Sequence, residues 1–213
     1  LIEAEKLKQQ LSLNLLQQQV NPHFLYNTLD NICALAELDE KETLIQLVMN
    51  LSSFYRSSLS NGKMHISIGQ ELEISRAYLE ILQIRYFHKF DFTITCPEAL
   101  KNYSCIKLLL QPILENSIYH GIKGLDRHGI LHIEAEDAGD CIRFTISDNG
   151  RGFSKEDYEK IWQQDADHFG IKSIQQRILL YYGPGYGLSM ESPQTGGCIT
   201  VITLPKQEGL PCH

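Results

Sequence analysis

The residue best suited to chemistry in the first part of the chain is His23, within the stretch QQQVNPHFLYNTLDNI at residues 17–32. The pattern indicates a helix whose apolar stripe is formed by Leu25, Leu29, Ile32 and Ala36. His23 then lies on roughly the opposite face, beside Asn27 and Asp30. Such an imidazole can be a metal ligand, a general base or a nucleophile toward a phosphoryl group. An exposed histidine without a role fits the same spacing.

A second group of candidate residues lies in LQPILENSIYHG, residues 110–121. We predict a helix here from about Cys105 to Gly121, with an inward stripe of Ile106, Leu109, Ile113 and Ser117. Asn116 and His120 share another face of this helix. A neutral amide facing a cleft is a reasonable magnesium ligand, because its oxygen binds the metal without adding charge beside phosphates.

Two glycine-containing segments follow. DNGRG, residues 148–152, ends a predicted strand, where the carboxylate of Asp148 suits the exocyclic amine of adenine and the glycines allow close backbone approach. FGIKS, residues 169–173, opens a predicted helix, where free amides and the helix dipole favour phosphate. Each segment alone is common, but their order and context together indicate a nucleotide site.

The elements before residue 65 are predicted to be helical. One long helix runs to about Leu38 and is bent at Pro22, and a second runs from about Lys41 to Ser60. The short link between them predicts an antiparallel hairpin. Its uncovered apolar face is buried either by dimerisation into a four-helix bundle or by packing onto the rest of the chain.

The hydrophobic period changes after a third predicted helix, about Ile68 to Phe87. Alternation predicts a strand at Phe90–Ile94, an antiparallel hairpin of two strands joined by residues 138–140, and two closing strands. The hairpin strands are predicted at 130–136 and 141–147, and the closing strands at 188–190 and 198–204. Two further helices are predicted at 154–162 and 170–182. The fold class is therefore α+β, a helical hairpin followed by a sandwich with helices over one face of a mixed sheet. We place the domain boundary at about residue 65, giving domains 1–65 and 66–213.

Composition excludes several classes of function. The 19 basic and 26 acidic residues give a net charge of −7, which argues against non-specific nucleic-acid binding. The six cysteines form no CxxC pair, as expected for a reduced cytosolic protein. We find no signal peptide and no apolar run that could span a bilayer. Because the chain begins at Leu1, we expect a fragment of a longer protein.

These motifs resemble known proteins over nearly the whole chain. The later domain is similar to the GHKL-type ATP-binding domain shared by gyrase, the heat-shock chaperone Hsp90, histidine kinases and MutL. QQQVNPHFLYNTLDNI resembles the phosphoacceptor region of the LytS, YehU and YesM branch of bacterial sensor histidine kinases. The resemblance implies that the cofactors are ATP and Mg²⁺ and that the partners are a second copy of the chain and a response regulator protein.

The resemblance also implies a role for individual residues. His23 is the phosphoacceptor, Asn116 the Mg²⁺ ligand and Asp148 the adenine contact. A lid over the phosphates spans roughly residues 153–169. The remaining ATP-site residues are the loop glycines Gly150 and Gly152, His120 on the helix of Asn116, the lid hinge Gly170, and the pair Gly197 and Cys198 beside the nucleotide.

The chain departs from the family pattern at three positions. Tyr119 stands where a lysine is usual, so a phosphate contact is either missing or supplied by Lys172 or Arg177. His168 replaces a lid glycine, and Ser173 replaces an asparagine.

The position of the glutamate that activates water in hydrolysing relatives is Pro112 here, and Glu115 lies about 100° around the helix from it. This disfavours an ATPase. The nucleophile expected is therefore His23, and Asp30, Glu115 and solvent all remain open as acceptors of its proton.

We therefore expect the cytoplasmic core of a sensor histidine kinase, held at the membrane by a preceding region. Such a core autophosphorylates on His23 and passes the phosphoryl group to an aspartate of a response regulator. The alternative is a degenerate kinase, a dimeric scaffold that binds nucleotide without autophosphorylation, which the changes at Tyr119 and His168 favour.

Overall fold

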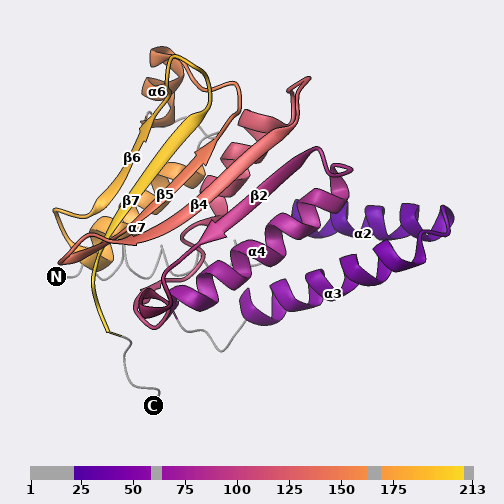
Figure 1. Ribbon diagram of the computed structural model, residues 1–213, viewed down its shortest axis with the longest axis horizontal. Coiled ribbons are helices and arrows are strands. Elements are labelled where there is room, and N and C mark those ends of the chain that lie inside the picture. The colour runs from indigo at the N-terminus through magenta and orange to yellow at the C-terminus, as the bar shows by residue number, and fades with distance from the viewer. Residues whose placement is uncertain (1–21, 59–63, 163–168, 209–213) are drawn as a thin grey trace.

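The computed structural model of the chain describes residues 22–58, 64–162 and 169–208. The helix predicted before Pro22 lies outside the described residues, as do Cys212 and the lid residues 163–168 with His168. The five described cysteines are free thiols. The elements form two parts, a helical hairpin and a sheet covered by helices, with one long helix between them (Figure 1).

The helical hairpin consists of α2 (Pro22–Glu37) and α3 (Lys41–Ser58). The buried face of α2 is formed by Phe24 and Thr28, whose hydroxyl donates to the Phe24 carbonyl at 2.7 Å. The predicted stripe of Leu25, Leu29, Ile32 and Ala36 is therefore not the buried one, since Leu29 and Ala36 are exposed. Through Phe24, the buried face contacts Phe54 of α3 and Tyr78 of the helix that follows the hairpin.

The helix that follows the hairpin is α4 (Ile68–Arg85), and its bounds are close to those predicted for the third helix. A capping box starts it, in which the Ser67 hydroxyl accepts from Gln70 N–H and the Gln70 side chain accepts from Ser67 N–H. Ten of its residues are buried, because it packs on the hairpin on one side and on the sheet and α5 on the other.

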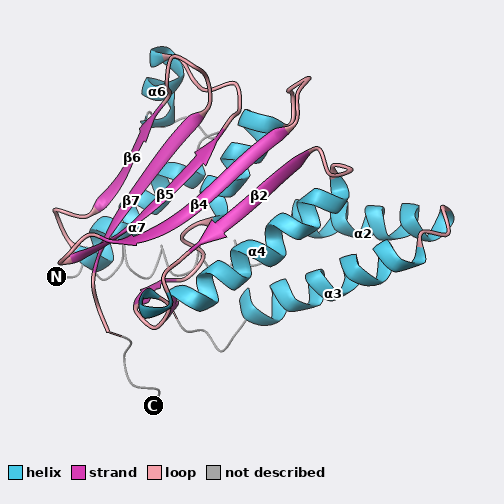
Figure 2. Ribbon diagram, viewed as in Figure 1, coloured by secondary structure: helices cyan, strands magenta, loops and turns pink. Residues whose placement is uncertain are grey.

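A five-stranded sheet carries the second part of the chain, in the order β2-β4-β5-β7-β6 (Figure 2). The strands are β2 (Phe90–Thr95), β4 (Gly129–Asp137), β5 (Cys141–Asp148), β6 (Gly187–Glu191) and β7 (Cys198–Pro205). β2 pairs with β4 in parallel and all other pairs are antiparallel. The predicted strands and the β4–β5 hairpin are thus confirmed.

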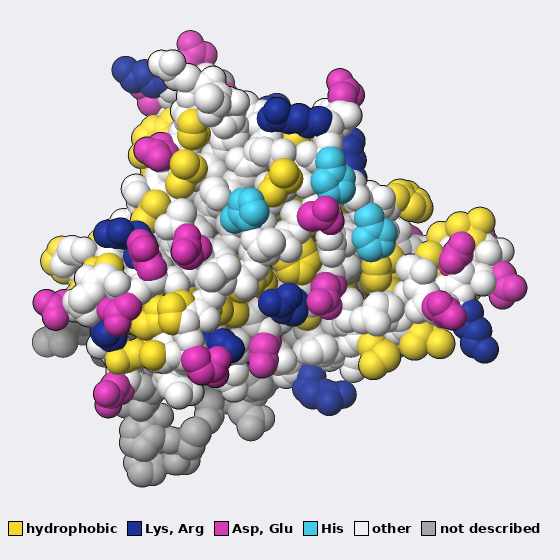
Figure 3. Space-filling model, in the orientation of Figure 1, with side chains coloured by type: hydrophobic (Ala, Val, Ile, Leu, Met, Phe, Trp, Pro, Cys, Tyr) yellow, Lys and Arg dark blue, Asp and Glu magenta, His cyan; other side chains and the backbone are white. Residues whose placement is uncertain are grey.

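Helices cover one face of this sheet. They are α4, α5 (Gln111–Asn116) with the π-helical segment η3 (Ser117–Ile122) that continues it, and α7 (Phe169–Tyr182), while α6 (Lys155–Trp162) lies toward one end (Figure 1). Alternate strand residues such as Ile133, Phe144 and Ile202 are buried beneath the helices. The opposite face is open, and charged, histidine and apolar side chains are interspersed on it (Figure 3).

The predicted helix from Cys105 is wrong at its start. Residues Ser104–Ile106 form a short strand, β3, which pairs antiparallel with β1 (His65–Ser67), and a 3₁₀ turn at Glu98–Leu100 precedes it. α5 begins only at Gln111, with Pro112 in its first turn, where the missing N–H of proline costs nothing. The run from Cys105 to Leu110 is buried on every side, so it carries no helical period.

Candidate functional site

Asp148 occupies the end of β5 on the face that the helices cover. It continues the buried alternation of Ile142, Phe144 and Ile146, so its carboxylate points between the sheet and η3. Its Oδ1 accepts from Gly150 N–H at 2.9 Å and from Cys198 N–H at 3.3 Å. Its Oδ2 is buried without a hydrogen-bond partner among the described residues. Burial raises the pKa of Asp148, and the nearby Ser117 hydroxyl together with the two backbone donors offsets part of that rise.

The facing wall of the site comes from α5 and η3. Asn116 ends α5, and the chain then widens into a π-helical turn, a form that often marks functional sites. A Cβ on Gly121 would lie 3.2 Å from Asp148 Oδ1, so the absence of a side chain lets the helix approach the carboxylate. His120 is exposed at the rim.

Two adjoining cavities lie along this wall and share Asn116 and His120. The first, about 120 Å³, is lined by Asn116, Ser117, His120, Gly121, Asp148, Arg151, Gly152, Phe153, Asp157, Ile161 and Cys198. It therefore brings together five of the predicted site residues with side chains of α6. The second, about 160 Å³, is lined by Pro112, Glu115, Asn116, Tyr119, His120, Gly170 and Ile171.

Close backbone packing explains the glycines of the site. A Cβ on Gly150 would lie 2.7 Å from both the Gly121 backbone and Asp148 Oδ1. Gly197 has φ +87° and donates to the Gly150 carbonyl at 2.9 Å, and a Cβ there would collide with the Asp148 carbonyl. Cys198 follows with its amide on Asp148, and burial raises the pKa of its thiol to about 11.

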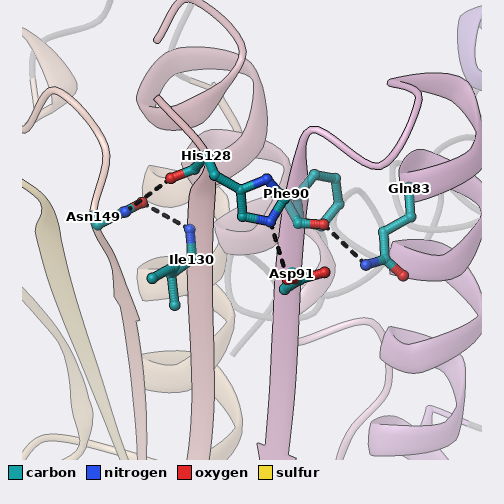
Figure 4. Close-up of polar contacts among 6 residues, drawn as sticks. All are labelled: Gln83, Phe90, Asp91, His128, Ile130 and Asn149. Atoms are coloured by element: carbon teal, nitrogen blue, oxygen red, sulfur yellow. Dashed lines mark hydrogen bonds and ion pairs between the residues drawn. The ribbon is translucent and has the colours of Figure 1, made fainter. Parts of the chain in front are cut away.

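Asn149 fixes the loop that follows Asp148, a role that the sequence analysis did not assign. Its Oδ1 accepts from Ile130 N–H at 2.7 Å and its Nδ2 donates to the His128 carbonyl at 3.1 Å (Figure 4). The same view shows His128 paired with Asp91 at 3.0 Å, an exposed pair that contributes little to stability. An asparagine between a strand end and a glycine is a known signal for side-chain bonding to the backbone, and it could have identified Asn149.

Lys172 and Arg177, the two residues considered as replacements for the usual lysine at the Tyr119 position, differ in their surroundings. Arg177 was a wrong candidate, because it is 2% exposed and donates to the backbone carbonyls of Lys107 and Leu108. Lys172 lies beside Ile171 but is not among the lining residues of either cavity. Tyr119 accepts a hydrogen bond from Arg85 Nη1 at 3.1 Å, which brings a guanidinium to the rim of the second cavity. Gly170 lines that cavity at the start of α7, and Ser173 is buried.

His23 lies apart from these walls, exposed on the first turn of α2. The residue after it, Phe24, is buried against Phe54 of α3 and Tyr78 of α4. The imidazole is therefore presented outward by a helix that is anchored through its neighbour.

The fold is thus a helical hairpin joined to an α+β domain that carries two adjoining cavities beside its sheet. A family model for histidine kinases matches residues 11–90, and a model for the histidine kinase-, DNA gyrase B- and HSP90-like ATPases matches residues 103–208. The chain belongs to the sensor histidine kinase family.

Individual relatives support the same assignment. Sensor histidine kinase YesM of Bacillus subtilis (strain 168) is 32% identical over 204 residues, 96% of this chain and 35% of that protein. Sensor histidine kinase BtsS of Escherichia coli (strain K12) is 33% identical over 181 residues, 85% of this chain and 31% of that protein. A crystal structure of histidine kinase ThkA in complex with response regulator protein TrrA has a similar fold, with TM-score 0.54 and 16% identity over 96% of this chain and 65% of that one.

The chain thus spans about a third of the length of these curated relatives. None of its described helices is both long and apolar enough to cross a membrane. Within the described residues, no cluster of three or more His, Cys, Asp or Glu side chains could hold a metal ion.

Proposed function

We propose that this chain is the kinase core of a two-component sensor. It binds ATP with Mg²⁺ in the two adjoining cavities, transfers the γ-phosphoryl group to His23, and passes that group to an aspartate of a response regulator. In this proposal the helical region up to residue 65 is the dimerisation and phosphoacceptor unit, and residues 66–213 form the nucleotide-binding unit.

One observation carries the proposal, the buried Oδ2 of Asp148. A buried acceptor without a partner is costly, and an amine donor entering the cavity would satisfy it. The exocyclic amine of adenine is such a donor. Gly121 and Gly150 pack closely against the carboxylate and so hold it in place at the wall of the cavity.

The residues present also fit Mg²⁺ and a phosphate chain. Asn116 lines both cavities and would hold the ion through its amide oxygen, with phosphate and water oxygens as the other ligands, since no carboxylate cluster is available among the described residues. The bound ion would neutralise charge on the phosphates. Each cavity is smaller than the roughly 300 to 1,000 Å³ of typical small-molecule pockets, so a nucleotide would span both.

In the transfer step, an imidazole nitrogen of His23 forms a bond to the γ-phosphorus while the bond from that phosphorus to the bridging oxygen breaks, and ADP leaves. This step depends on positioning and charge neutralisation. Pro112, at the position of the hydrolytic glutamate, lines the second cavity without offering a base to water. The acceptor of the imidazole proton is not assigned.

The proposed partners rest on the hairpin surface and on the family. Large apolar side chains are exposed along α2 and α3, and a second copy of the chain would cover them in a four-helix bundle; they are Tyr26, Leu29, Ile45, Val48 and Met49. The ThkA complex with TrrA supports a response regulator as partner, and the names of the relatives as sensor kinases support a membrane-held sensor region. These extensions concern the whole protein.

A second candidate, the scaffold that binds nucleotide without autophosphorylation, is favoured by one contact. The position that usually presents a lysine presents the hydroxyl of Tyr119, and that hydroxyl is bound to Arg85. If Arg85 stays on Tyr119, the phosphate chain has one cation fewer.

Label transfer from γ-labelled ATP with Mg²⁺ distinguishes the two candidates. The unaltered chain is compared with His23→Gln and Asn116→Ala, and with His88→Gln as a control at another exposed histidine. If the chain is a kinase, the unaltered chain and the His88→Gln control should take acid-labile, alkali-stable label, and His23→Gln and Asn116→Ala should not. Measurable nucleotide binding without any label on the unaltered chain would contradict the kinase and support the scaffold.

A further inference from the structure

Tyr78 stands between the phosphoacceptor helix and the helix of the nucleotide site. It lies in the middle of α4 and is 1% exposed. Its ring centroid is 5.0 Å from that of Phe24 on α2 and 5.8 Å from that of Phe54 on α3. Since Phe24 and Phe54 are also in contact, with centroids 5.3 Å apart, the three rings form one aromatic cluster that fixes the hairpin against α4.

The hydroxyl of Tyr78 points the other way, toward the nucleotide site. It donates to Glu115 Oε1 at 3.2 Å, and the Gln111 side chain donates to the same oxygen at 3.1 Å. Glu115 is on α5 and lines the second cavity together with Asn116. Burial and the neighbouring Glu115 carboxylate both raise the pKa of Tyr78, so the phenol remains protonated and stays a donor.

These two contacts reach the residues next to the two reacting centres. Phe24 directly follows His23, and Glu115 directly precedes Asn116. A shift of α2 relative to α5 must therefore either break the Tyr78–Glu115 hydrogen bond or separate the aromatic rings. Breaking the bond would leave a buried hydroxyl unpaired, which is unfavourable.

We propose that Tyr78 is a positioning residue for phosphoryl transfer, which couples occupancy of the Asn116 cavity to the placement of His23 through its contacts with Glu115 and Phe24. The proposal rests on the proposed kinase function. It assigns to α4 a part in the reaction beyond packing, because one side chain of that helix touches the neighbours of both donor site and acceptor.

A purely structural role is the competing explanation, and Tyr55 provides the matched control. Tyr55 also packs on Phe54, with ring centroids 5.3 Å apart, and its buried hydroxyl has no hydrogen-bond partner among the described residues. Tyr55→Phe and Tyr78→Phe therefore both keep a ring packed on Phe54. Only Tyr78→Phe removes a bond to the nucleotide site.

The experiment measures the rate of label transfer to His23 over a range of ATP concentrations. It compares the unaltered chain with Tyr78→Phe, Glu115→Ala, the double variant and Tyr55→Phe. We expect Tyr78→Phe to lower kcat about tenfold with KM unchanged, because the lost bond orders the helices rather than binding ATP. Tyr55→Phe should change neither constant. In the Glu115→Ala background, Tyr78→Phe should cost nothing further, because both residues act through one hydrogen bond.

Other outcomes overturn the proposal. They are an equal effect of Tyr78→Phe and Tyr55→Phe, an effect on KM alone, or an undiminished effect of Tyr78→Phe beside Glu115→Ala. If the unaltered chain takes no label, the proposed function fails, and coupling is read from amide hydrogen exchange of α2 and α3 with and without Mg-ADP. ADP should then slow that exchange in the unaltered chain and not in Tyr78→Phe. No effect of ADP on the unaltered chain also overturns the coupling.

Discussion

Glu71 and Arg177 contact the same segment of chain, residues 107–110, from two different helices. Glu71 of α4 accepts from Leu108 N–H at 2.8 Å and from Leu110 N–H at 2.9 Å, while Arg177 of α7 donates to the Leu108 carbonyl at 3.1 Å. Both are almost completely buried, at 0% and 2% exposure. Leu110 caps α5, so the two charged side chains set where the helix of Asn116 begins.

Replacing Arg177 by methionine should therefore be costly. The substitution keeps an apolar stem but leaves two carbonyl oxygens without the guanidinium donor. It also removes one of the two positive charges near the buried Glu71 carboxylate, the other being Lys107. Loss of one partner of such buried charges typically costs about 3 to 5 kcal/mol. Urea unfolding of Arg177→Met measures this loss of unfolding free energy.

The control is Gln176→Met, at an exposed position on the same helix. It should stay within about 0.5 kcal/mol of the unaltered chain. Equal unfolding free energies for the two variants would show that the Arg177 contacts do not stabilise the fold.

The sequence predicted most elements where burial is one-sided. β4 and β5 alternate between the helix-covered and open faces, so their period of two is visible, and α3, α4 and α7 were found within a few residues of their ends. Asp148 was identified because a carboxylate at the end of a predicted strand, followed by two glycines, suits the exocyclic amine of adenine.

The rest depends on contacts distant in sequence. On α2, two stripes offset by one residue are both plausible, and only the packing of Phe24 on Tyr78 selects the one that contains the polar Thr28. Arg177 was one of the alternatives for a phosphate contact, and the sequence could not exclude it because its carbonyl partners lie in a segment about 70 residues earlier. No local period reveals such partners, and a charged residue inside an apolar stripe, as at Glu71, is the one available signal.

Gly150→Ala tests how closely the nucleotide loop and η3 pack. The added Cβ would lie 2.7 Å from the backbone of Gly121 and from Asp148 Oδ1, so the loop or the helix must move. Overpacking of this kind typically costs about 1 to 3 kcal/mol. Thermal unfolding in the absence of nucleotide measures the cost, and weaker ADP binding should accompany it.

Gly124→Ala is the comparison, since a Cβ there meets nothing within 4 Å. Its unfolding should be unchanged or slightly higher in temperature, because alanine restricts the unfolded chain. A Gly150→Ala variant as stable as Gly124→Ala would contradict the close approach of loop and helix.

Asp148→Asn should separate nucleotide binding from stability. The amide oxygen can keep the bonds from Gly150 and Cys198, but its NH₂ group would face the adenine amine donor to donor. We expect ADP affinity to fall about 10- to 100-fold, the range for a lost hydrogen bond to a charged group. Calorimetric titration with Mg-ADP measures it.

Without nucleotide, the same variant should be no less stable than the unaltered chain near neutral pH. The substitution removes a carboxylate whose pKa burial raises, so it removes a desolvation cost. A large loss of stability would mean that the carboxylate serves the fold itself.

The raised pKa of Asp148 also predicts opposite pH trends for stability and for binding. The folded chain binds the Asp148 proton more tightly than the unfolded chain does, so this group stabilises the fold as pH falls through the raised folded pKa, and the gain is complete below the unfolded value. The proposed adenine contact would instead use the ionised carboxylate, so ADP affinity should fall as pH falls through the same window. Glu71 also has a raised pKa, so it can add to any change with pH. The quantity to compare is therefore the pH dependence of ADP affinity in the unaltered chain and in Asp148→Asn. The ADP affinity of Asp148→Asn should be nearly independent of pH in this window. Titrations of both proteins from neutral pH toward pH of about 4, the ordinary range of aspartate, measure this difference. ADP affinity that holds constant until the pH enters that ordinary range would contradict a buried acceptor at Asp148.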